Sequence, residues 1–267
     1  MNLHIPSTDE RLLFFDDFNS NQLDRSKWNV QKTGDVVNNE QQAYIDSEET
    51  IYTLKGDNDE GILAIHPHWK PGYKSTRGQI FDFVSGRIDT HGKFDFTYGS
   101  ISACIKLPAG SGLWPAFWVL GAGKWPTCGE IDIMENIGEP DWISAAVHGP
   151  GFYGDRALVN NKYFASENDV TRWHIYTVDW TPDESLIFKV DNELIYRVTR
   201  PMVHTFGPWV FSNPKYIILN FAVGGGYPNK INNIRHPYFG LPEETVQLIR
   251  SGEVRMLIDW VMVNNFR

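Results

Sequence analysis

Apolar and polar positions alternate along most of this chain, and few segments show helical spacing. The clearest series runs through the segments WHIYTVDW, TPDES, LIFKVD, NE and LIYRV, from Trp173 to Val198. Alternation with a period of two is typical of half-buried strands, and Pro-Asp and Asp-Asn pairs are typical of tight turns. The series therefore predicts a meander of antiparallel strands.

The rest of the chain shows the same strand signals. GKFDFTYGSISACIKL predicts two alternating stretches that break at Gly99, KYIILNFAVGG predicts a buried strand, and VRMLIDWVMVNNF predicts a last strand. Only Glu243–Gly252 has helical spacing, with Val246 and Ile249 three residues apart. Many short strands and few helices predict a two-sheet β-sandwich. No repeat or linker divides the 267 residues, so we expect one domain over residues 1–267.

A further strand is predicted for Gly129–Gly138, the segment GEIDIMENIG, because Ile131 and Ile133 are β-branched and glycines bracket the segment. Successive side chains of a strand point to opposite faces. Glu130 and Asp132 therefore share one face, while the two isoleucines share the other and can enter the core.

The third acid of this segment is out of phase. Strict alternation would put Glu135 on the face of the isoleucines, and burying an unpaired carboxylate is costly. One extra residue, a β-bulge near Ile133–Met134, restores the phase. Glu130, Asp132 and Glu135 then line a single face.

A strand face with three carboxyl groups could catalyse the hydrolysis of a glycosidic bond. With the bulge, the Cα atoms of Glu130 and Glu135 lie roughly 13 Å apart, and their long side chains can lean toward each other. Retaining glycosidases need two carboxyl groups about 5–5.5 Å apart, one to attack the anomeric carbon and one to protonate the leaving oxygen. Asp132 between them can hydrogen-bond the nucleophile and raise a neighbour's pKa. A solvated acidic edge strand and a divalent-metal site remain alternatives from spacing alone.

Charge and composition narrow the partners. The formal net charge of -9 argues against nucleic acid, since a phosphate backbone needs a basic footprint. Aromatic residues make up 14% of the chain. We expect most of them in a β-rich core, because aromatic residues favour strands, and three or four tryptophans along a ligand groove.

Cysteine usage and the chain's start add little. Two cysteines, Cys104 and Cys128, are too few for a disulfide framework, and we favour buried thiols. The first ten residues, MNLHIPSTDE, show no signal-peptide pattern, and no apolar stretch reaches membrane-spanning length.

The acidic segment also resembles the active-site signature of glycoside hydrolase family 16, in the form with one extra residue between the Asp and the second Glu. Further segments are similar to the laminarinase branch of that family, so the resemblance spans nearly the whole chain. They include NNEQQAY, SGRIDTHGKFDFTYG, KLPAGSGLWPAFWVLG, AAVHGPGF, WHIYTVDWTPDESLIFKVDNE and YIILNFAVGG.

The resemblance implies an all-β fold, a β-jelly roll sandwich of two curved antiparallel sheets with a substrate cleft along the concave face. It implies that Glu130 is the nucleophile and that Glu135 is the general acid and then the general base. Asp132 would be the assisting acid between them, and the product would keep the anomeric configuration of the substrate.

Three tryptophans gain cleft roles from the resemblance. Trp114, Trp118 and Trp125 are similar to the family's cleft tryptophans, whose indole faces stack on glucose rings. Core packing remains the alternative, most of all for Trp118.

Four further residues are implied as substrate-binding. Arg87 resembles an arginine that hydrogen-bonds sugar hydroxyls on the non-reducing side, with a surface ion pair as the alternative. Asn38 and Asn39 resemble a glycone-side loop, and which of them reaches the sugar stays open. His148 would lie near the acid/base, with a purely structural histidine as the alternative.

No cofactor is implied for catalysis, but the family often carries a structural calcium ion on the convex face. Asp259 matches the usual carboxylate ligand. Backbone oxygens near Gly61 and a group near Asp17 would complete the site, since calcium prefers six to eight oxygens.

The function implied is that of an endo-acting β-1,3-glucanase, cleaving laminarin-like glucan or also mixed-linkage β-1,3-1,4-glucan. Hydrolysis of a marine galactan such as agar, carrageenan or porphyran is an alternative, because enzymes of the family that act on these galactans share the bulged signature. Pro67–Phe83 and the segment after the AVGG strand match poorly, and such loops can change the substrate. A non-catalytic, lectin-like glucan-binding protein and a metal-dependent hydrolase are two others. We expect an exported monomer whose partner is a polysaccharide, with no nucleic-acid or membrane partner.

Overall fold

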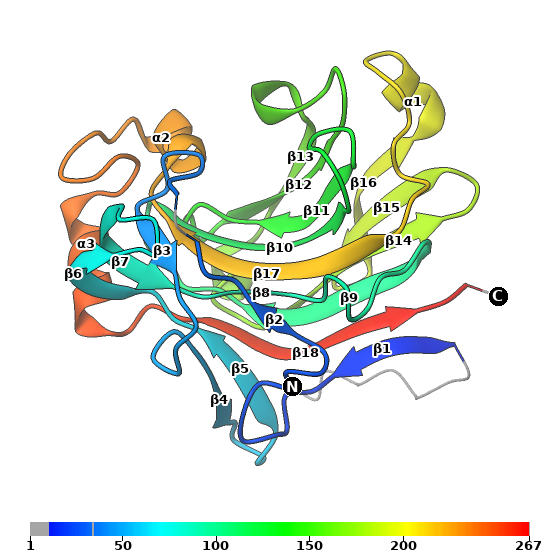
Figure 1. Ribbon diagram of the computed structural model, residues 1–267. Coiled ribbons are helices and arrows are strands. Elements are labelled where there is room, and N and C mark those ends of the chain that lie inside the picture. Colours follow the sequence, from blue (N-terminus) through cyan, green and yellow to red (C-terminus); the bar gives the residue numbers. More distant parts are fainter. Residues whose placement is uncertain (1–10, 34, 267) are drawn as a thin grey trace.

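The computed structural model describes residues 11–33 and 35–266, so the N-terminal segment MNLHIPSTDE lies outside the described residues. Two curved sheets are stacked with their concave sides facing the same way (Figure 1). We call them the outer sheet and the cleft sheet. All pairings between their strands are antiparallel, as predicted for a jelly-roll sandwich.

The outer sheet has eight strands, in the order β16-β15-β14-β9-β18-β5-β4 with β1 paired to β18. Their bounds are β1 Leu12–Asp16, β4 Ile51–Lys55, β5 Gly61–Ile65, β9 Gly99–Lys106, β14 His174–Thr181, β15 Ser185–Val190, β16 Glu193–Thr199 and β18 Met256–Asn264.

The cleft sheet has seven strands, in the order β13-β12-β11-β10-β17-β8-β2. Their bounds are β2 Asn29–Val30, β8 Arg87–Asp89, β10 Leu113–Gly121, β11 Glu130–Glu135, β12 Trp142–His148, β13 Leu158–Tyr163 and β17 Lys215–Val223.

The predicted meander is confirmed as β14, β15 and β16. Val190 pairs with Glu193, which leaves Asp191 and Asn192 as a two-residue turn, and their φ angles are 51° and 68°. Positive φ at both central residues is the type I′ conformation, whose twist matches that of antiparallel strands. The Asp-Asn pair thus sets the register of this hairpin.

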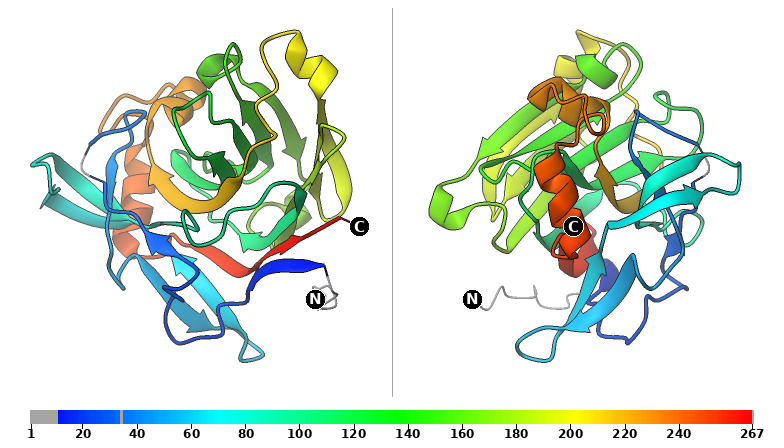
Figure 2. Two further views of the ribbon diagram at one scale, coloured as in Figure 1. Left: turned by 45° about the vertical axis from the view of Figure 1, so that its right-hand side comes forward. Right: turned by 90° about the vertical axis from the view of Figure 1, so that its left-hand side faces the viewer.

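A third, small sheet was not predicted. It contains β3 (Gln42–Tyr44), β6 (His68–Lys74) and β7 (Ile80–Ser85), and its β3–β7 pairing is parallel. It includes most of the poorly matching segment Pro67–Phe83, and the β6–β7 hairpin projects from one side of the sandwich (Figure 2).

The helices are few, as expected. The predicted helix is present as α3 (Glu243–Ser251), but α1 (Arg200–His204) and α2 (Gly226–Asn232) were not predicted. Two single-turn 3₁₀ helices, η1 (Gly154–Arg156) and η2 (Ser166–Asn168), complete the set within the described residues.

One strand prediction was wrong. The stretch before Gly99 is not a regular strand, and Phe96 alone makes an isolated bridge, to Lys215. Its aromatic side chains pack instead, with Phe96 edge-on to Trp180 at 5.7 Å between ring centroids. The alternation of apolar and polar residues before Gly99 therefore reflects loop side chains that pack into the core, and not strand pairing.

The core lies between the two sheets. The cleft sheet contributes side chains such as Phe117, Ile131 and Ile133, and the outer sheet contributes Trp180 and Phe188, all buried. Cys104 and Cys128 are free buried thiols, as favoured above. No helix among the described residues is long and apolar enough to cross a bilayer.

Candidate active site

The register of β11 shifts at the position where the sequence predicts a bulge. On β10, Phe117 lies opposite Met134 and the next residue, Trp118, lies opposite Asp132, so Ile133 is the extra residue. The β12 side repeats the shift between Asp132 and Glu135. Because of this extra residue, an odd spacing along β11 can still bring acids to one face.

The two faces of β11 are accordingly unlike. Ile131, Ile133 and Met134 belong to the buried core. Glu130, Asp132 and Glu135 line a cleft of about 420 Å³ on the opposite face. The three acids thus lie together on one face.

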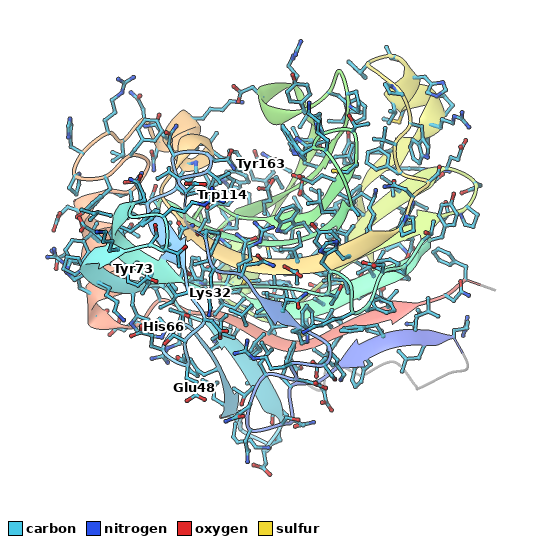
Figure 3. The ribbon with its side chains drawn as sticks, viewed as in Figure 1. Lys32, Glu48, His66, Tyr73, Trp114 and Tyr163 are labelled. Carbon is cyan, nitrogen blue, oxygen red and sulfur yellow. The ribbon has the colours of Figure 1, made fainter. Side chains whose placement is uncertain are left out.

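Two indole N–H groups hold the outer acids. Trp114 Nε1 donates to Glu135 Oε1 at 2.9 Å, and Trp125 Nε1 donates to Glu130 Oε2 at 2.8 Å. Trp114 lies on the side of the cleft sheet that faces away from β18 (Figure 3). Both side chains line the cleft, and sequence reasoning expected their stacking faces but missed these hydrogen bonds to the acids.

Burial and mutual repulsion make the acids hard to ionise together. Burial, with the charge of Asp132 next in importance, raises the pKa of Glu130 to about 8. Burial and then the charge of Glu135 raise the pKa of Asp132 well above its usual range, and burial raises the pKa of Glu135. The cluster therefore keeps protons to higher pH than free carboxyl groups do, and an acid that keeps its proton is what protonation of a leaving group requires.

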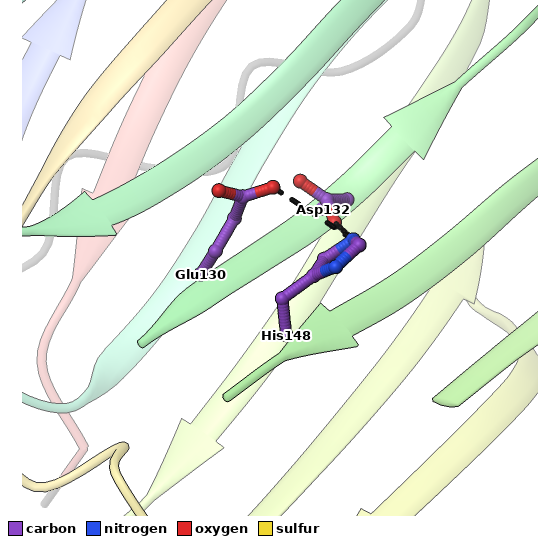
Figure 4. Close-up of side chains that lie close together, drawn as sticks. All are labelled: Glu130, Asp132 and His148. Carbon is purple, nitrogen blue, oxygen red and sulfur yellow. Dashed lines mark ion pairs between the residues drawn. The ribbon is translucent and has the colours of Figure 1, made fainter. Parts of the chain in front are cut away.

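His148 lies beside Asp132 and Glu130, and its charge also acts on the predicted acid/base, Glu135. Its Nε2 is 3.1 Å from Asp132 Oδ2 and 3.8 Å from Glu130 Oε1 (Figure 4). His148 is directly opposite Glu130 in the β11–β12 pairing, whereas Glu135 is opposite Ser144. Opposite residues on neighbouring strands have adjacent side chains, so this register sets the neighbour.

The imidazole has a defined orientation. Gly154 N–H donates to His148 Nδ1 at 3.1 Å. A nitrogen that accepts a hydrogen bond carries no proton, so neutral His148 has its proton on Nε2, toward Asp132. The ligand atoms of Glu130, Asp132 and His148 lie within 4.8 Å of one another, a spacing that also suits a divalent cation.

A second group of side chains lines the cleft beyond the acids. The Arg87 guanidinium lies 5.0 Å from the centroid of the Trp118 ring, and Trp118 Nε1 donates to Asn220 Oδ1 at 2.7 Å. Asn220 Nδ2 in turn donates to Tyr44 Oη at 3.0 Å. Trp118 and Arg87 therefore line the cleft, rather than packing in the core or pairing at the surface.

The cleft residues that sequence reasoning missed include Glu40, Tyr44 and Asn220. Each lies inside a segment that carried the resemblance, NNEQQAY or YIILNFAVGG, and that was the available signal. Burial raises the pKa of Glu40, and the nearby Arg87 charge offsets part of that rise.

The structure separates the two asparagines of the glycone-side loop. Asn38 lines the cleft with the acids. Asn39 lines a neighbouring hollow of about 540 Å³, which contains none of the three acids. Both have positive φ, 52° and 57°, a conformation that asparagine tolerates better than most residues.

Two of the residues expected at a calcium site, Asp259 and Asp17, lie within electrostatic range of each other. Asp259 lies at a register shift in β18, and burial, followed by the charges of Glu60 and Asp17, raises the pKa of its carboxyl. A Cβ at Gly61 would lie 2.1 Å from the Phe18 carbonyl oxygen, so backbone from both segments meets there. Crowded carboxylates beside carbonyl oxygens fit a calcium ion.

Comparison with known proteins gives consistent matches. The family described as glycosyl hydrolases family 16 matches residues 25–236. The solved endo-β-1,3-glucanase of Pyrococcus furiosus is 33% identical, with a TM-score of 0.83 over 96% of this chain and 95% of that chain.

Two curated relatives are longer than this chain. The glucan endo-1,3-beta-glucosidase A1 of Niallia circulans is 32% identical over 81% of this chain and 34% of its own length. The keratan-sulfate endo-1,4-beta-galactosidase of Sphingobacterium multivorum is 30% identical over 88% of this chain and 54% of its own length. The chain thus spans about half or less of the length of these two relatives.

Proposed function

The chain belongs to glycosyl hydrolases family 16, and from this premise we propose that it is a retaining endo-glycosidase that hydrolyses β-1,3-glucan. The observation that carries the proposal is the placement of Glu130 and Glu135 on one face of β11, each hydrogen-bonded by a cleft tryptophan. The similar Pyrococcus furiosus enzyme supports the choice of glucan.

The two acids divide the chemistry in a double displacement. Ionised Glu130 attacks the anomeric carbon, while protonated Glu135 gives its proton to the glycosidic oxygen as that bond breaks. Water then attacks the glycosyl–enzyme ester and gives a proton to Glu135, and Glu130 leaves as a carboxylate. Two inversions restore the original anomeric configuration.

Asp132 keeps Glu130 ready to attack. Its pKa stands well above its usual range, which favours the protonated form that can donate a hydrogen bond to Glu130. His148 Nε2 lies 3.1 Å from Asp132 Oδ2, so the imidazole is the nearest polar group to that oxygen on the β12 side. Asp132 is therefore the assisting acid, and His148 acts through it.

The cleft walls bind the sugar chain. The faces of Trp114, Trp118 and Trp125 offer apolar surface to glucose rings, and Trp125 is the most open of them at 42% exposed. Arg87 and Asn38 offer hydrogen-bond donors on the glycone side. Asn39 faces the neighbouring hollow, so its contribution to the cleft is indirect.

Catalysis uses no cofactor in this scheme, and calcium would have a structural role. Asp259, with backbone oxygen near Gly61 and a group at Asp17, would hold the ion on the outer sheet and stabilise the junction of β1, β5 and β18. We propose that residues 1–267 form one catalytic domain that acts as a monomer outside the cell, where polysaccharides are found.

Reducing-sugar release from a panel of polysaccharides tests the proposal. The panel contains laminarin, lichenan, agarose, carrageenan and keratan sulfate, each incubated with the native protein and with Glu130→Gln. We expect release from laminarin that disappears in the variant. Equal activity of both proteins would overturn the assigned nucleophile.

The similarity to a keratan-sulfate endo-1,4-beta-galactosidase makes a galactan the second candidate substrate. Release from agarose, carrageenan or keratan sulfate and none from laminarin would select it. Binding to laminarin with no release from any polysaccharide would instead select a lectin-like protein.

A further inference from the structure

Lys215, the first residue of β17, is fully buried behind the strand that carries Glu130. Its Nζ donates to the carbonyl oxygen of Cys128 at 3.0 Å, to Asn213 Oδ1 at 3.0 Å and to the Val210 carbonyl oxygen at 3.4 Å. Three acceptors use all three donors of an ammonium group. The group therefore has a complete set of partners without solvent.

This is an expensive way to fill a core position. A buried ammonium loses its hydration, and here no carboxylate within residues 11–33 and 35–266 forms an ion pair with it. The rings of Trp180 and Phe211 lie 5.6 and 5.7 Å from Nζ and offer only weak compensation. An apolar residue would fill the same space without this cost, so the hydrogen bonds of Lys215 call for a reason.

The Cys128 carbonyl group, which accepts a hydrogen bond from Lys215, belongs to the short segment Lys124–Gly129 that leads into β11. Asn213 Nδ2 also donates to the Cys128 carbonyl oxygen, at 3.1 Å. On one side, a Cβ at Gly121 would lie 2.1 Å from that oxygen, and on the other a Cβ at Gly129 would lie 2.4 Å from the Val210 carbonyl oxygen. The segment is thus held between the end of β10 and residues 209–213.

The same segment presents Trp125 to the proposed nucleophile. Trp125 donates to Glu130 Oε2 and meets the edge of Tyr153 at 5.3 Å between ring centroids, but 42% of its surface is exposed. Packing of its side chain alone holds it weakly. The direction of the Trp125 N–H group therefore depends on the backbone that Lys215 holds.

We propose that Lys215 is a positioning residue for the hydrolytic reaction, fixing the Lys124–Gly129 backbone so that Trp125 and Glu130 keep their hydrogen bond. The inference rests on the proposed function, since it assigns Glu130 as the nucleophile. Lys215 touches no substrate and acts only through the segment.

The test compares Lys215→Met with Lys93→Met. Lys93 also donates to main-chain carbonyls, including that of Trp28 at 2.8 Å, but it is exposed and does not line the cleft, so it controls for the loss of lysine–carbonyl hydrogen bonds elsewhere in the molecule. Displacing a reacting group by about 1 Å can cost about 100-fold in rate. For Lys215→Met we expect kcat on laminarin oligosaccharides to fall by about 10- to 100-fold with KM changed less than about threefold. Lys93→Met should keep the native kcat.

Two readouts separate positioning from general destabilisation. Burial raises the pKa of Glu130, and the Trp125 hydrogen bond offsets part of that rise. Loosening this bond should therefore move the acidic limb of kcat/KM to higher pH in both Lys215→Met and Trp125→Phe. In the double variant the two effects should be strongly non-additive, whereas Lys93→Met and Trp125→Phe should combine additively.

Hydrogen exchange tests, without any substrate, the clamp that Lys215 forms on the segment Lys124–Gly129. Amide exchange over residues 122–135 should speed up in Lys215→Met and stay native in Lys93→Met. If Lys215→Met does not fold, Asn213→Ala removes two bonds of the same network at a partly buried position and should give a smaller change of the same kind. Native exchange together with a native kcat, or additive effects with Trp125→Phe, would overturn the inference. If the native protein cleaves nothing on the panel, the proposed function fails, while the exchange experiment still decides whether the clamp exists.

Discussion

The molecule contains two pairs of histidine and aspartate, one on the outer sheet and one in the cleft, and they are built for opposite purposes. On the outer sheet, His174 Nδ1 meets Asp191 Oδ2 at 2.7 Å and His174 Nε2 meets the Asp169 carbonyl oxygen at 2.9 Å. Both ring nitrogens face acceptors, so both carry protons. Burial alone would lower the pKa of His174, but the bonds to Asp191 and Asp169 outweigh it and raise the pKa.

In the cleft, by contrast, His148 faces a cluster of carboxyl groups that repel one another when ionised. Its Nδ1 is occupied by an N–H donor, and its Nε2 points at Asp132 within a cluster of three acids whose pKa values are all raised, each by burial first. The outer pair satisfies every charge and stabilises the fold. The cleft cluster leaves charge unsatisfied and can exchange protons with a substrate. Replacing a member of each group should therefore have opposite consequences: loss of activity in the cleft and loss of stability on the outer sheet.

The largest effect is expected for Glu135→Gln. Loss of a general acid and base typically lowers the rate by about 10²- to 10⁴-fold. An aryl glucoside with an activated leaving group needs less protonation, so it should lose less rate than laminarin does. Added azide should raise turnover of the aryl substrate by attacking the glycosyl–enzyme, and the product should be the β-glycosyl azide.

The melting temperature of Glu135→Gln tests whether the cleft cluster, unlike the outer pair, contributes no stability. Because Glu135→Gln removes a like charge from a buried cluster, we expect no loss of thermal stability. A lower melting temperature, or a failure of azide to raise turnover, would contradict the role given to Glu135.

The second largest effect is expected for His174→Gln, which should lower the stability of the fold and leave turnover unchanged. Leaving buried polar groups without a partner costs about 1–3 kcal/mol, which corresponds to a melting temperature lower by very roughly 2–10 °C in a chain of this size. Turnover should stay native, because His174 lies on the outer sheet. Calorimetry measures the melting temperature, and kcat on laminarin measures turnover. A lower kcat with an unchanged melting temperature would contradict the purely structural role given to the outer pair.

The stability difference between native protein and His174→Gln should depend on pH. The pKa of His174 is raised from 6.5, so its contribution is fully present below pH 6.5 and is lost as pH rises through the raised folded value. Burial would raise the pKa of Asp191, but His174 lowers it from 3.8, so its contribution is present above pH 3.8 and is lost as pH falls through the lowered value. The difference should be widest between these limits, and a difference that grows in alkaline solution would contradict this assignment.

The smallest effect is expected from calcium removal. With a dissociation constant of about 10⁻⁴–10⁻³ M, about 1 mM calcium stabilises by about 0.4–1.4 kcal/mol. A chelator should lower the melting temperature of the native protein slightly, leave its initial rate unchanged, and have no effect on Asp259→Asn. Immediate loss of activity on chelation would instead indicate a metal ion at Glu130, Asp132 and His148.

The residues that could be predicted from sequence are those set by short-range alternation. The bulge between Asp132 and Glu135 follows from the phase of one strand, and the turn at Asp191–Asn192 follows from two residues. The neighbour of His148 could not be predicted in this way, because it depends on the register between β11 and β12. The role proposed for Lys215 depends on the carbonyl group of Cys128, 87 residues earlier in the chain, and no local pattern encodes that contact.

Proton NMR of the first product most directly tests the central claim that Glu130 and Glu135 act by double displacement. Laminarihexaose is mixed with a large amount of enzyme, and the anomeric signals are recorded before mutarotation. The account predicts that the β-anomer appears first and the α-anomer grows in later. Initial appearance of the α-anomer would mean a single inverting displacement and would contradict the assignment of Glu130 as nucleophile.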